Sequence, residues 1–229
     1  GTVQSVTVGD IATSIGDKAF MGCTSLKTVS IPDSVTTIGD YAFQSCTSLE
    51  TVSIPNSVTS IGSYAFKGCS AITTLIINTP LVGSTANGFV PTFFSDSKSN
   101  VENVTIGGSV TSIGDSAFYE CTSLETVSIG NSVTSIGDQA FRKCTSLETM
   151  SIPHSVTTIG YQAFYGCSSL KTVSIPASVK SIDYQAFRFC TSLETVSIPD
   201  SVTSIGSDAC TGCSAITTLI INNPLVGST

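Results

Sequence analysis

Cysteine is the residue type in this sequence with the widest range of possible chemistry. The chain of 229 residues contains nine cysteines, and Cys210 and Cys213 form a Cys-x-x-Cys pair, a spacing found in redox centres and metal sites. A metal site would need further ligands from other segments, and His154 is the single histidine. Eight of the cysteines recur at one position of a repeat, beside apolar residues. We therefore interpret them as small buried hydrophobic side chains, with Cys210 in place of a core phenylalanine, and expect no metal and no other cofactor.

Hydrolytic catalysis would need side chains that act together, and no such set can be assigned in the sequence. His154 occupies a loop position held by Asp33, Asn56 and Asp200 in other repeats, so we interpret it as an exposed loop residue. The serines fill repeated positions, and none can be paired with His154 in a catalytic triad. The 16 acidic residues are dispersed, which disfavours paired-carboxylate catalysis. The sequence predicts a protein that is not an enzyme.

The charge and hydrophobicity of the chain argue against two classes of partner. Charged residues make up 11% of the chain and its net charge is −7, so no basic patch is available to neutralise phosphates. We therefore expect no nucleic-acid partner. The longest apolar stretches, such as 75–77, are far shorter than the roughly 18 residues of a membrane-spanning helix. We also expect no insertion into a membrane.

A 23-residue repeat organises almost the whole chain. The segments 48–70 and 146–168 align without a gap, and cysteines recur 23 positions apart within each of two runs. A fixed period of this length is typical of a stacked architecture. The two runs are separated by 52 positions between Cys69 and Cys121, which corresponds to one ordinary repeat and one of 29 residues, with an insertion within 78–100. Ten strand-like segments predict about ten coils in a single domain, 1–229.

Each repeat has a pattern of apolar residues that predicts which side chains face inward. In the segment that begins at Leu49, a short strand would bury Val52 and Ile54 and expose the residues between them. A glycine such as Gly62 recurs in nearly every repeat, and we interpret it as a left-handed backbone position. The residue after this glycine is often an aspartate, such as Asp40, which we expect to cap a short helical turn. The Ala-Phe pair of that turn would pack inward.

The pattern L-x-x-V-x-I-P-x-S-V-T-x-I-G-x-x-A-F-x-x-C resembles the BspA-like class of leucine-rich repeats. The resemblance covers nearly the whole chain and departs from the pattern in the 29-residue repeat and at Cys210. It implies an α/β leucine-rich-repeat solenoid, a curved right-handed stack with one short parallel strand per coil and short helical or 3-10 turns on the other side. It also implies an extracellular or cell-surface protein, often with an adhesive role.

A second, longer period predicts that the chain is a fragment of a longer array. The segment 70–85 recurs as 214–229, with a single difference at Thr79 and Asn223.

The 29-residue repeat contains further aromatic residues in its insertion. We expect Phe93 and Phe94 to replace the Ala-Phe core pair and Phe89 to be available for contacts with a partner.

The outward residues of the strands are the candidate binding face. They form rows of short hydroxyl side chains with acidic residues at the start of the strands. An equally good interpretation is that threonine and serine are simply suited to a solvated strand. A glycosylation sequon at Asn103 is a separate and weaker signal. The candidates for the face are Thr51, Ser53, Thr126, Ser128, Thr149, Ser151, Thr172, Ser174, Thr195, Ser197, Glu125 and Glu148.

Three functions agree with these features. The leading hypothesis is a non-enzymatic scaffold that binds a protein or glycan through its concave face. The alternative is a structural spacer or self-assembling subunit whose coils stack end to end. A third hypothesis is binding to ice or another crystal surface through the regular Thr/Ser rows.

Overall fold

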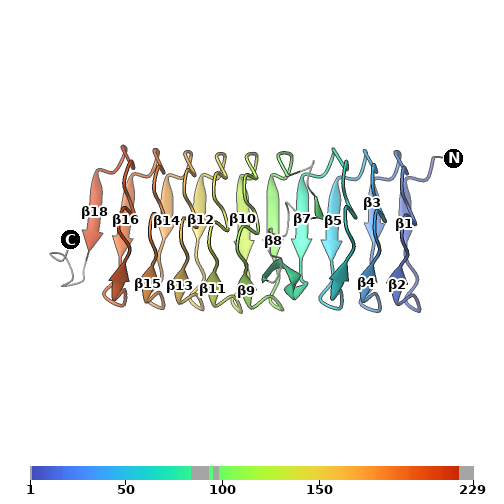
Figure 1. Ribbon diagram of the computed structural model, residues 1–229, viewed down its shortest axis with the longest axis horizontal. Coiled ribbons are helices and arrows are strands. Elements are labelled where there is room, and N and C mark those ends of the chain that lie inside the picture. The colour runs from blue at the N-terminus through green and yellow to red at the C-terminus, as the bar shows by residue number, and fades with distance from the viewer. Residues whose placement is uncertain (1, 84–92, 95–97, 222–229) are drawn as a thin grey trace.

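The chain folds into a single stack of coils whose strands run side by side along its length (Figure 1). The computed structural model describes residues 2–83, 93–94 and 98–221. One side of the stack carries ten strands of three or four residues, which we call the strand face. Its strands are β1 (Ser5–Thr7), β3 (Thr28–Ser30), β5 (Thr51–Ile54), β7 (Thr74–Ile77), β8 (Asn103–Ile106), β10 (Thr126–Ile129), β12 (Thr149–Ser151), β14 (Thr172–Ser174), β16 (Thr195–Ile198) and β18 (Thr218–Ile221).

The opposite side carries two-residue strands, each formed by a hydroxyl residue and an isoleucine. They are β2 (Ser14–Ile15), β4 (Thr37–Ile38), β6 (Ser60–Ile61), β9 (Ser112–Ile113), β11 (Ser135–Ile136), β13 (Thr158–Ile159), β15 (Ser181–Ile182) and β17 (Ser204–Ile205). All strand pairs on both sides are parallel, as expected for successive coils of a solenoid.

The structure has fewer complete turns than the ten coils predicted from the sequence. Eight coils within the described ranges contain both a long and a short strand, which gives a solenoid of about eight turns. In the atypical coil, the place of the short strand is taken by the 3-10 turn η1 (Pro80–Gly83). For the last long strand, β18, the described residues end at its final position.

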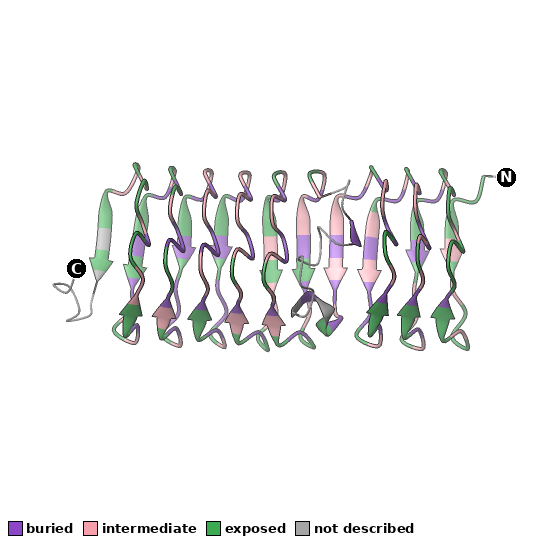
Figure 2. Cartoon of the chain, in the orientation of Figure 1, coloured by how far each residue is buried: buried purple, intermediate pink, exposed green. Residues whose placement is uncertain are grey.

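The core is a continuous column between the two sides of the stack. Along most of the long strands the inward residues are buried and the outward ones more exposed, as Figure 2 shows, whereas the inward residues of β1 and β10 are half-buried. In β16, for example, Val196 and Ile198 are buried whereas Thr195 and Ser197 are exposed. This alternation confirms the inward and outward assignments made from the apolar pattern, because successive strand residues point to opposite sides.

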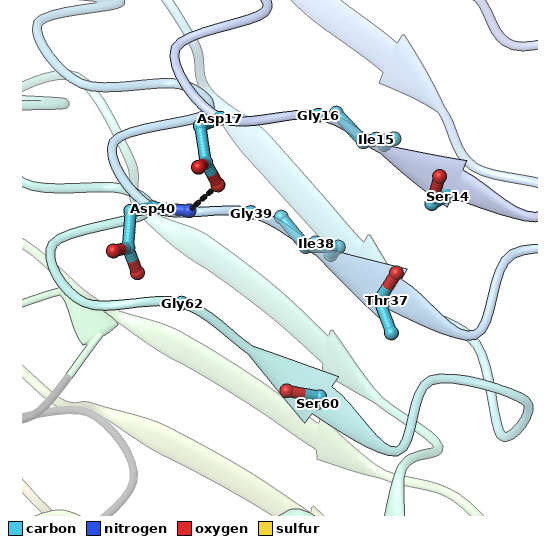
Figure 3. Close-up of a pocket in the computed structure, with 10 residues that line it drawn as sticks. All are labelled: Ser14, Ile15, Gly16, Asp17, Thr37, Ile38, Gly39, Asp40, Ser60 and Gly62. Atoms are coloured by element: carbon cyan, nitrogen blue, oxygen red, sulfur yellow. Dashed lines mark hydrogen bonds between the residues drawn. The ribbon is translucent and has the colours of Figure 1, made fainter.

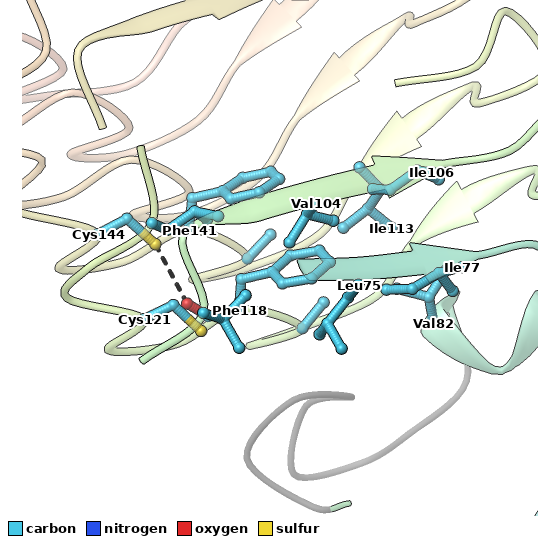
Figure 4. Close-up of a cluster of buried hydrophobic side chains, with 14 of the residues drawn as sticks. Leu75, Ile77, Val82, Val104, Ile106, Ile113, Phe118, Cys121, Phe141 and Cys144 are labelled. Atoms are coloured by element: carbon cyan, nitrogen blue, oxygen red, sulfur yellow. Dashed lines mark hydrogen bonds between the residues drawn. The ribbon is translucent and has the colours of Figure 1, made fainter. Parts of the chain in front are cut away.

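Stacked phenylalanine rings form the centre of this column (Figure 4). The rings of Phe118 and Phe141 have centroids 5.1 Å apart, and those of Phe164 and Phe187 lie 5.2 Å apart with an angle of 1° between their planes. Each of these rings therefore contacts an equivalent ring in a neighbouring coil. A coil that lost its neighbour would expose this surface to water, which explains why the repeats fold as a stack.

The expectation of helical turns after the short strands is wrong, because these segments are built from turns with essentially no helix. Successive amides alternate between two kinds of acceptor. The amide of Gln44 donates to the carbonyl oxygen of Tyr41 in the same turn, whereas the amide of Phe43 donates to that of Ala65 in the next coil. A helix would direct every amide to its own segment. The turns instead use half of their amides to join neighbouring coils.

Left-handed residues allow this alternation, and the glycines of the Gly62 type are not among them. The third residue of each turn has a positive φ, as at Tyr41 (56°) and Gln162 (52°). The glycines of the Gly62 type are needed for another reason, since a Cβ at Gly137 would lie 2.8 Å from the backbone nitrogen of Asp115. The glycine thus lets two coils approach closely, which corrects the interpretation of a left-handed position.

The aspartates that follow these glycines do not cap helices. Asp17 Oδ1 accepts a hydrogen bond of 2.8 Å from the amide of Asp40, and Asp138 Oδ1 accepts one of 2.9 Å from the amide of Tyr161. In both pairs the two residues are 23 positions apart. Each carboxylate therefore satisfies a backbone donor of the next coil, as a cap satisfies a donor of its own helix.

The atypical coil keeps the core continuous with different residues. Val82 is fully buried and its carbonyl oxygen accepts a hydrogen bond of 2.9 Å from the amide of Gly114. Phe93 and Phe94 are buried, and the Phe94 ring stacks on Phe66 with centroids 4.8 Å apart. The expectation that this phenylalanine pair replaces the Ala-Phe pair is confirmed.

Candidate binding surface

The outward hydroxyls of the strand face form two rows in register. Thr149 lies opposite Thr172 on the neighbouring strand, and Ser151 lies opposite Ser174. The same two rows continue to Thr195 and Ser197. These six residues are exposed, as are Thr126 and Ser128 on β10, whereas Thr51 and Ser53 on β5 are half-buried. The strand face therefore displays paired hydroxyls on four successive strands, β10 to β16.

The rows are interrupted on the N-terminal side of β10. The outward position that holds serine in other strands is occupied by Ile76 in β7. On β8, Asn103 takes the place of a threonine, and its Oδ1 accepts a hydrogen bond of 2.6 Å from the hydroxyl of Thr126. The sequon asparagine thus has its side-chain oxygen engaged by the neighbouring strand.

The acidic candidates lie at the start of the strands and are exposed. Glu148 forms an ion pair with Lys171 of the next coil, with 2.9 Å between Oε2 and Nζ, and about half of each side chain remains accessible. Glu125, in the preceding coil, is also exposed. An ion pair at this exposure adds little stability, so both carboxylates remain open to a partner. The last candidate, Phe89, lies outside the described residues.

A groove on the side of the short strands was not anticipated from the sequence (Figure 3). Its volume is about 470 Å³, and it is lined by hydroxyl residues such as Ser14 and Thr37 together with the carboxylates of Asp17 and Asp40. The dashed contact in Figure 3 is the bond from the Asp40 amide to Asp17. The Ile-Gly-Asp sequence, which occurs in four coils, was the available signal, because it places a carboxylate at this edge in each of them.

A ridge of aromatic and arginine side chains was also missed. It runs along the turns, where the residue after the core phenylalanine alternates between tyrosine and arginine over four coils. We call it the turn ridge and define it as Tyr119, Arg142, Tyr165, Arg188 and Phe189. The guanidinium of Arg142 lies 5.8 Å from the ring centroid of Tyr119 and 4.8 Å from that of Tyr165. The alternation at 23-residue spacing was the signal that could have revealed it.

The repeated cysteines are free thiols inside the core, as expected. Six of the nine are fully buried, and Cys23, Cys210 and Cys213 are partly exposed. Burial raises the pKa of Cys121 and of Cys167 to about 12. Thiols in such surroundings remain protonated near neutral pH and are poor nucleophiles.

Cys210 and Cys213, the Cys-x-x-Cys pair, influence each other's pKa. Hydrogen bonds from Cys190 and Cys210 lower the pKa of Cys213. The hydrogen bond with Cys213 raises the pKa of Cys210. Throughout the described ranges, no group of three or more His, Cys, Asp or Glu side chains is arranged to hold a metal ion.

The comparison with protein families identifies the repeat. The family model for the BspA-type leucine-rich repeat region, which spans six copies, matches residues 2–124 and residues 87–217. The chain belongs to the BspA-type leucine-rich repeat family. No curated protein sequence matches the chain significantly.

Several solved structures resemble this BspA-type chain. A leucine-rich cell surface protein from Faecalibacterium prausnitzii shares 26% identity over 94% of the chain, with a TM-score of 0.45. A leucine-rich repeat protein from Eubacterium ventriosum shares 24% over 81%, with a TM-score of 0.53. The pneumococcal vaccine antigen PcpA shares 20% over 94%, with a TM-score of 0.46.

The BspA-type chain spans only part of these proteins: 59%, 42% and 61% of their respective lengths. The Eubacterium likeness supports a leucine-rich repeat fold. Within the described residues, no helix has both the length and the apolar character to cross a membrane. Family and fold together describe a repeat scaffold.

Proposed function

We propose that this scaffold is a non-enzymatic binding module, displayed outside the cell or on its surface, that recognises a protein or glycan through the strand face. One observation carries the proposal: the paired rows of exposed hydroxyls on β10 to β16, which are in register on the hydrogen-bonded strands β12, β14 and β16. Short hydroxyls donate and accept hydrogen bonds, so a repeated row offers many equivalent contacts.

The carboxylates beside the rows add charge to the recognition surface. Glu125 and Glu148 are exposed at the start of two neighbouring strands. They favour a partner with donor groups or positive charge at that edge. The surface location is supported by the family and by the Faecalibacterium relative, which is described as a cell surface protein.

The test is a binding screen of the purified chain against a glycan array and a panel of extracellular matrix proteins. Two variants probe the proposed face: a double charge reversal, Glu125→Lys with Glu148→Lys, and a double substitution, Thr149→Lys with Thr195→Lys. Thr158→Lys is the control, because Thr158 is an exposed strand residue on the opposite side of the stack. Binding that survives both double variants would contradict the proposal.

A structural spacer or self-assembling subunit is the second candidate, supported by the close similarity of successive coils. It predicts filaments whose light scattering rises with protein concentration, and whose formation is unaffected by the strand-face variants. Ice binding has weaker support, because Ile76 and Asn103 interrupt the hydroxyl rows. A thermal hysteresis measurement tests it directly.

A further inference from the structure

The turn ridge holds an arginine whose position is fixed from several sides. The Arg142 guanidinium lies between the rings of Tyr119 and Tyr165. Its Nη1 donates a hydrogen bond of 2.7 Å to Oε1 of Gln162, a side chain only 6% exposed. The Gln162 amide in turn donates to Oε1 of Gln185 at 2.6 Å. A guanidinium held in this way loses little freedom when it binds a ligand.

The charge of Arg142 is not neutralised by the protein. In the part of the chain that the structure describes, no carboxylate forms an ion pair with it. The neighbouring lysines Lys98 and Lys143 share a single partner, Glu120, at 3.1 and 2.9 Å. This part of the ridge therefore carries excess positive charge on a chain whose net charge is −7.

Phe189 adds an exposed aromatic ring in a strained backbone conformation. Its φ is +60° and 39% of the residue is exposed. The equivalent position of four other coils is held by glycine, at Gly22, Gly68, Gly166 and Gly212. A bulky residue with positive φ costs free energy, and an exposed ring gains little by folding. The Phe189 ring packs edge-on against Tyr165, with centroids 5.5 Å apart, and so extends the ridge.

The shape of the ridge limits the partners that fit it. It consists of one side chain in each of four coils, with Phe189 beside Arg188 in the last, whereas a stable interface with a globular protein buries roughly 800 Å² on each side. An extended peptide would need free backbone groups, but the amides of Phe118 and Glu120 already donate to the next coil. A single-stranded nucleic acid would need a series of open aromatic faces for successive bases, but Arg142 lies over both tyrosines and Arg188 lies over Phe189.

We propose that the turn ridge binds an acidic polysaccharide, a chain of sugars that carry carboxylates. One carboxylate pairs with the guanidinium of Arg142. The apolar face of a nearby sugar packs on the part of the Phe189 ring that the Arg188 guanidinium, 4.9 Å from the ring centroid, leaves exposed. Arg142 and Phe189 belong to turns two coils apart, on the order of 10 Å at the usual spacing of parallel strands. This is about the length of two linked sugar rings, so a single polymer reaches both residues.

Polygalacturonate is the probe for this proposal, with dextran as the neutral polymer and polyglutamate as a carboxylate polymer without sugars. Binding to the purified chain is measured by biolayer interferometry. Arg142→Gln removes the charge, and we expect a loss of affinity of about tenfold or more, the usual effect of removing a charged hydrogen bond. We expect Phe189→Gly to weaken binding at least about threefold while the thermal midpoint stays equal or rises, because glycine relieves the positive φ.

Lys67→Gln is the matched control, because Lys67 occupies the position of Arg142 in another coil and also lies over a tyrosine, 4.9 Å from the Tyr64 centroid. We expect Lys67→Gln to keep full affinity for polygalacturonate. We expect the same of the strand-face double variant Thr149→Lys with Thr195→Lys. The proposal is overturned if polygalacturonate does not bind, if it binds no better than dextran, or if Lys67→Gln weakens it as much as Arg142→Gln. Equal binding of polyglutamate would assign the ridge to acidic proteins instead.

Discussion

The thiol of Cys144 donates a hydrogen bond of 3.2 Å to the carbonyl oxygen of Phe118 in the preceding coil. The same contact joins Cys167 to Phe141 at 3.1 Å. The repeated cysteine is therefore more than an apolar filler, since its thiol gives a second hydrogen bond to a buried carbonyl group that already accepts one from an amide of its own coil. Figure 4 shows this bond beside the stacked phenylalanine rings.

Cys144→Ala tests the contribution of this contact. The substitution removes one of the two donors to the Phe118 carbonyl, which keeps the amide of Cys121 at 3.2 Å, and it opens a small cavity in the core. We expect the free energy of unfolding to fall by about 1–3 kcal/mol, mainly because of the cavity. Urea denaturation followed by circular dichroism measures the change. Cys23→Ala is the control, because Cys23 is partly exposed, and a loss as large as that of Cys144→Ala would contradict this account.

Thiol accessibility provides a second prediction. In the native protein at pH 8, we expect only Cys23 and Cys213 to react rapidly with a thiol reagent such as Ellman's reagent. Six of the other thiols are buried, and the hydrogen bond to Cys213 raises the pKa of Cys210. Denaturation should expose all nine. Fewer than nine thiols in the denatured, unreduced protein would reveal disulfides, and rapid reaction of all nine in the native protein would show that the thiols do not lie in the core.

A matched pair of glycine substitutions tests the close approach of the coils. A Cβ at Gly137 would lie 2.8 Å from both the nitrogen of Asp115 and the carbonyl carbon of Gly114, whereas a Cβ at Gly16 meets nothing within 4 Å. We expect Gly137→Ala to destabilise the protein by about 1–3 kcal/mol, the usual range for overpacking. Gly16→Ala should be nearly neutral in the same thermal denaturation experiment. Equal effects would show that backbone conformation, not contact between coils, selects glycine at this position.

The Glu120 carboxylate makes stability depend on pH. Hydrogen bonds from Lys143 and Lys98 lower its pKa from the ordinary 4.5 to about 2. A carboxylate with a lowered pKa stabilises the fold above its unfolded pKa, and the contribution is lost as the pH falls toward the folded value. We expect Glu120→Gln to reduce the loss of stability between about pH 5 and pH 2. Because the side chain is one-third exposed, the effect should be small, and identical pH profiles of the two proteins would exclude it.

Much of the fold could be predicted from the sequence because the same spacing of apolar residues recurs in nearly every repeat. The inward positions of Val196 and Ile198 and the burial of Cys144 follow from apolar residues that recur with one period. Phe94 could be placed in the core because Phe93 and Phe94 form a pair that can replace the Ala-Phe pair in the 29-residue repeat. The family resemblance rests on the same recurrence and was confirmed.

The turn ridge and the groove were less predictable than the strand face, because their residues are brought together only when the coils stack. Tyr119, Arg142 and Tyr165 are separated along the chain by a full repeat each, and their contact depends on how neighbouring turns are aligned. The groove beside Asp17 and Asp40 depends on the same alignment. A search of the sequence for adjacent functional residues does not detect such sets.

The sequence by itself determined the period, the inward face of each coil and the rows of hydroxyls on the strands, since each depends on local alternation of polar and apolar residues. Only the tertiary structure decided that the segments around Phe43 and Phe141 are turns and not helices. The reason is that every second amide there bonds to a carbonyl of the adjacent coil. That bond, the close approach at Gly137 and the contacts of Arg142 all join residues about one repeat apart, so they exist only when the coils are stacked.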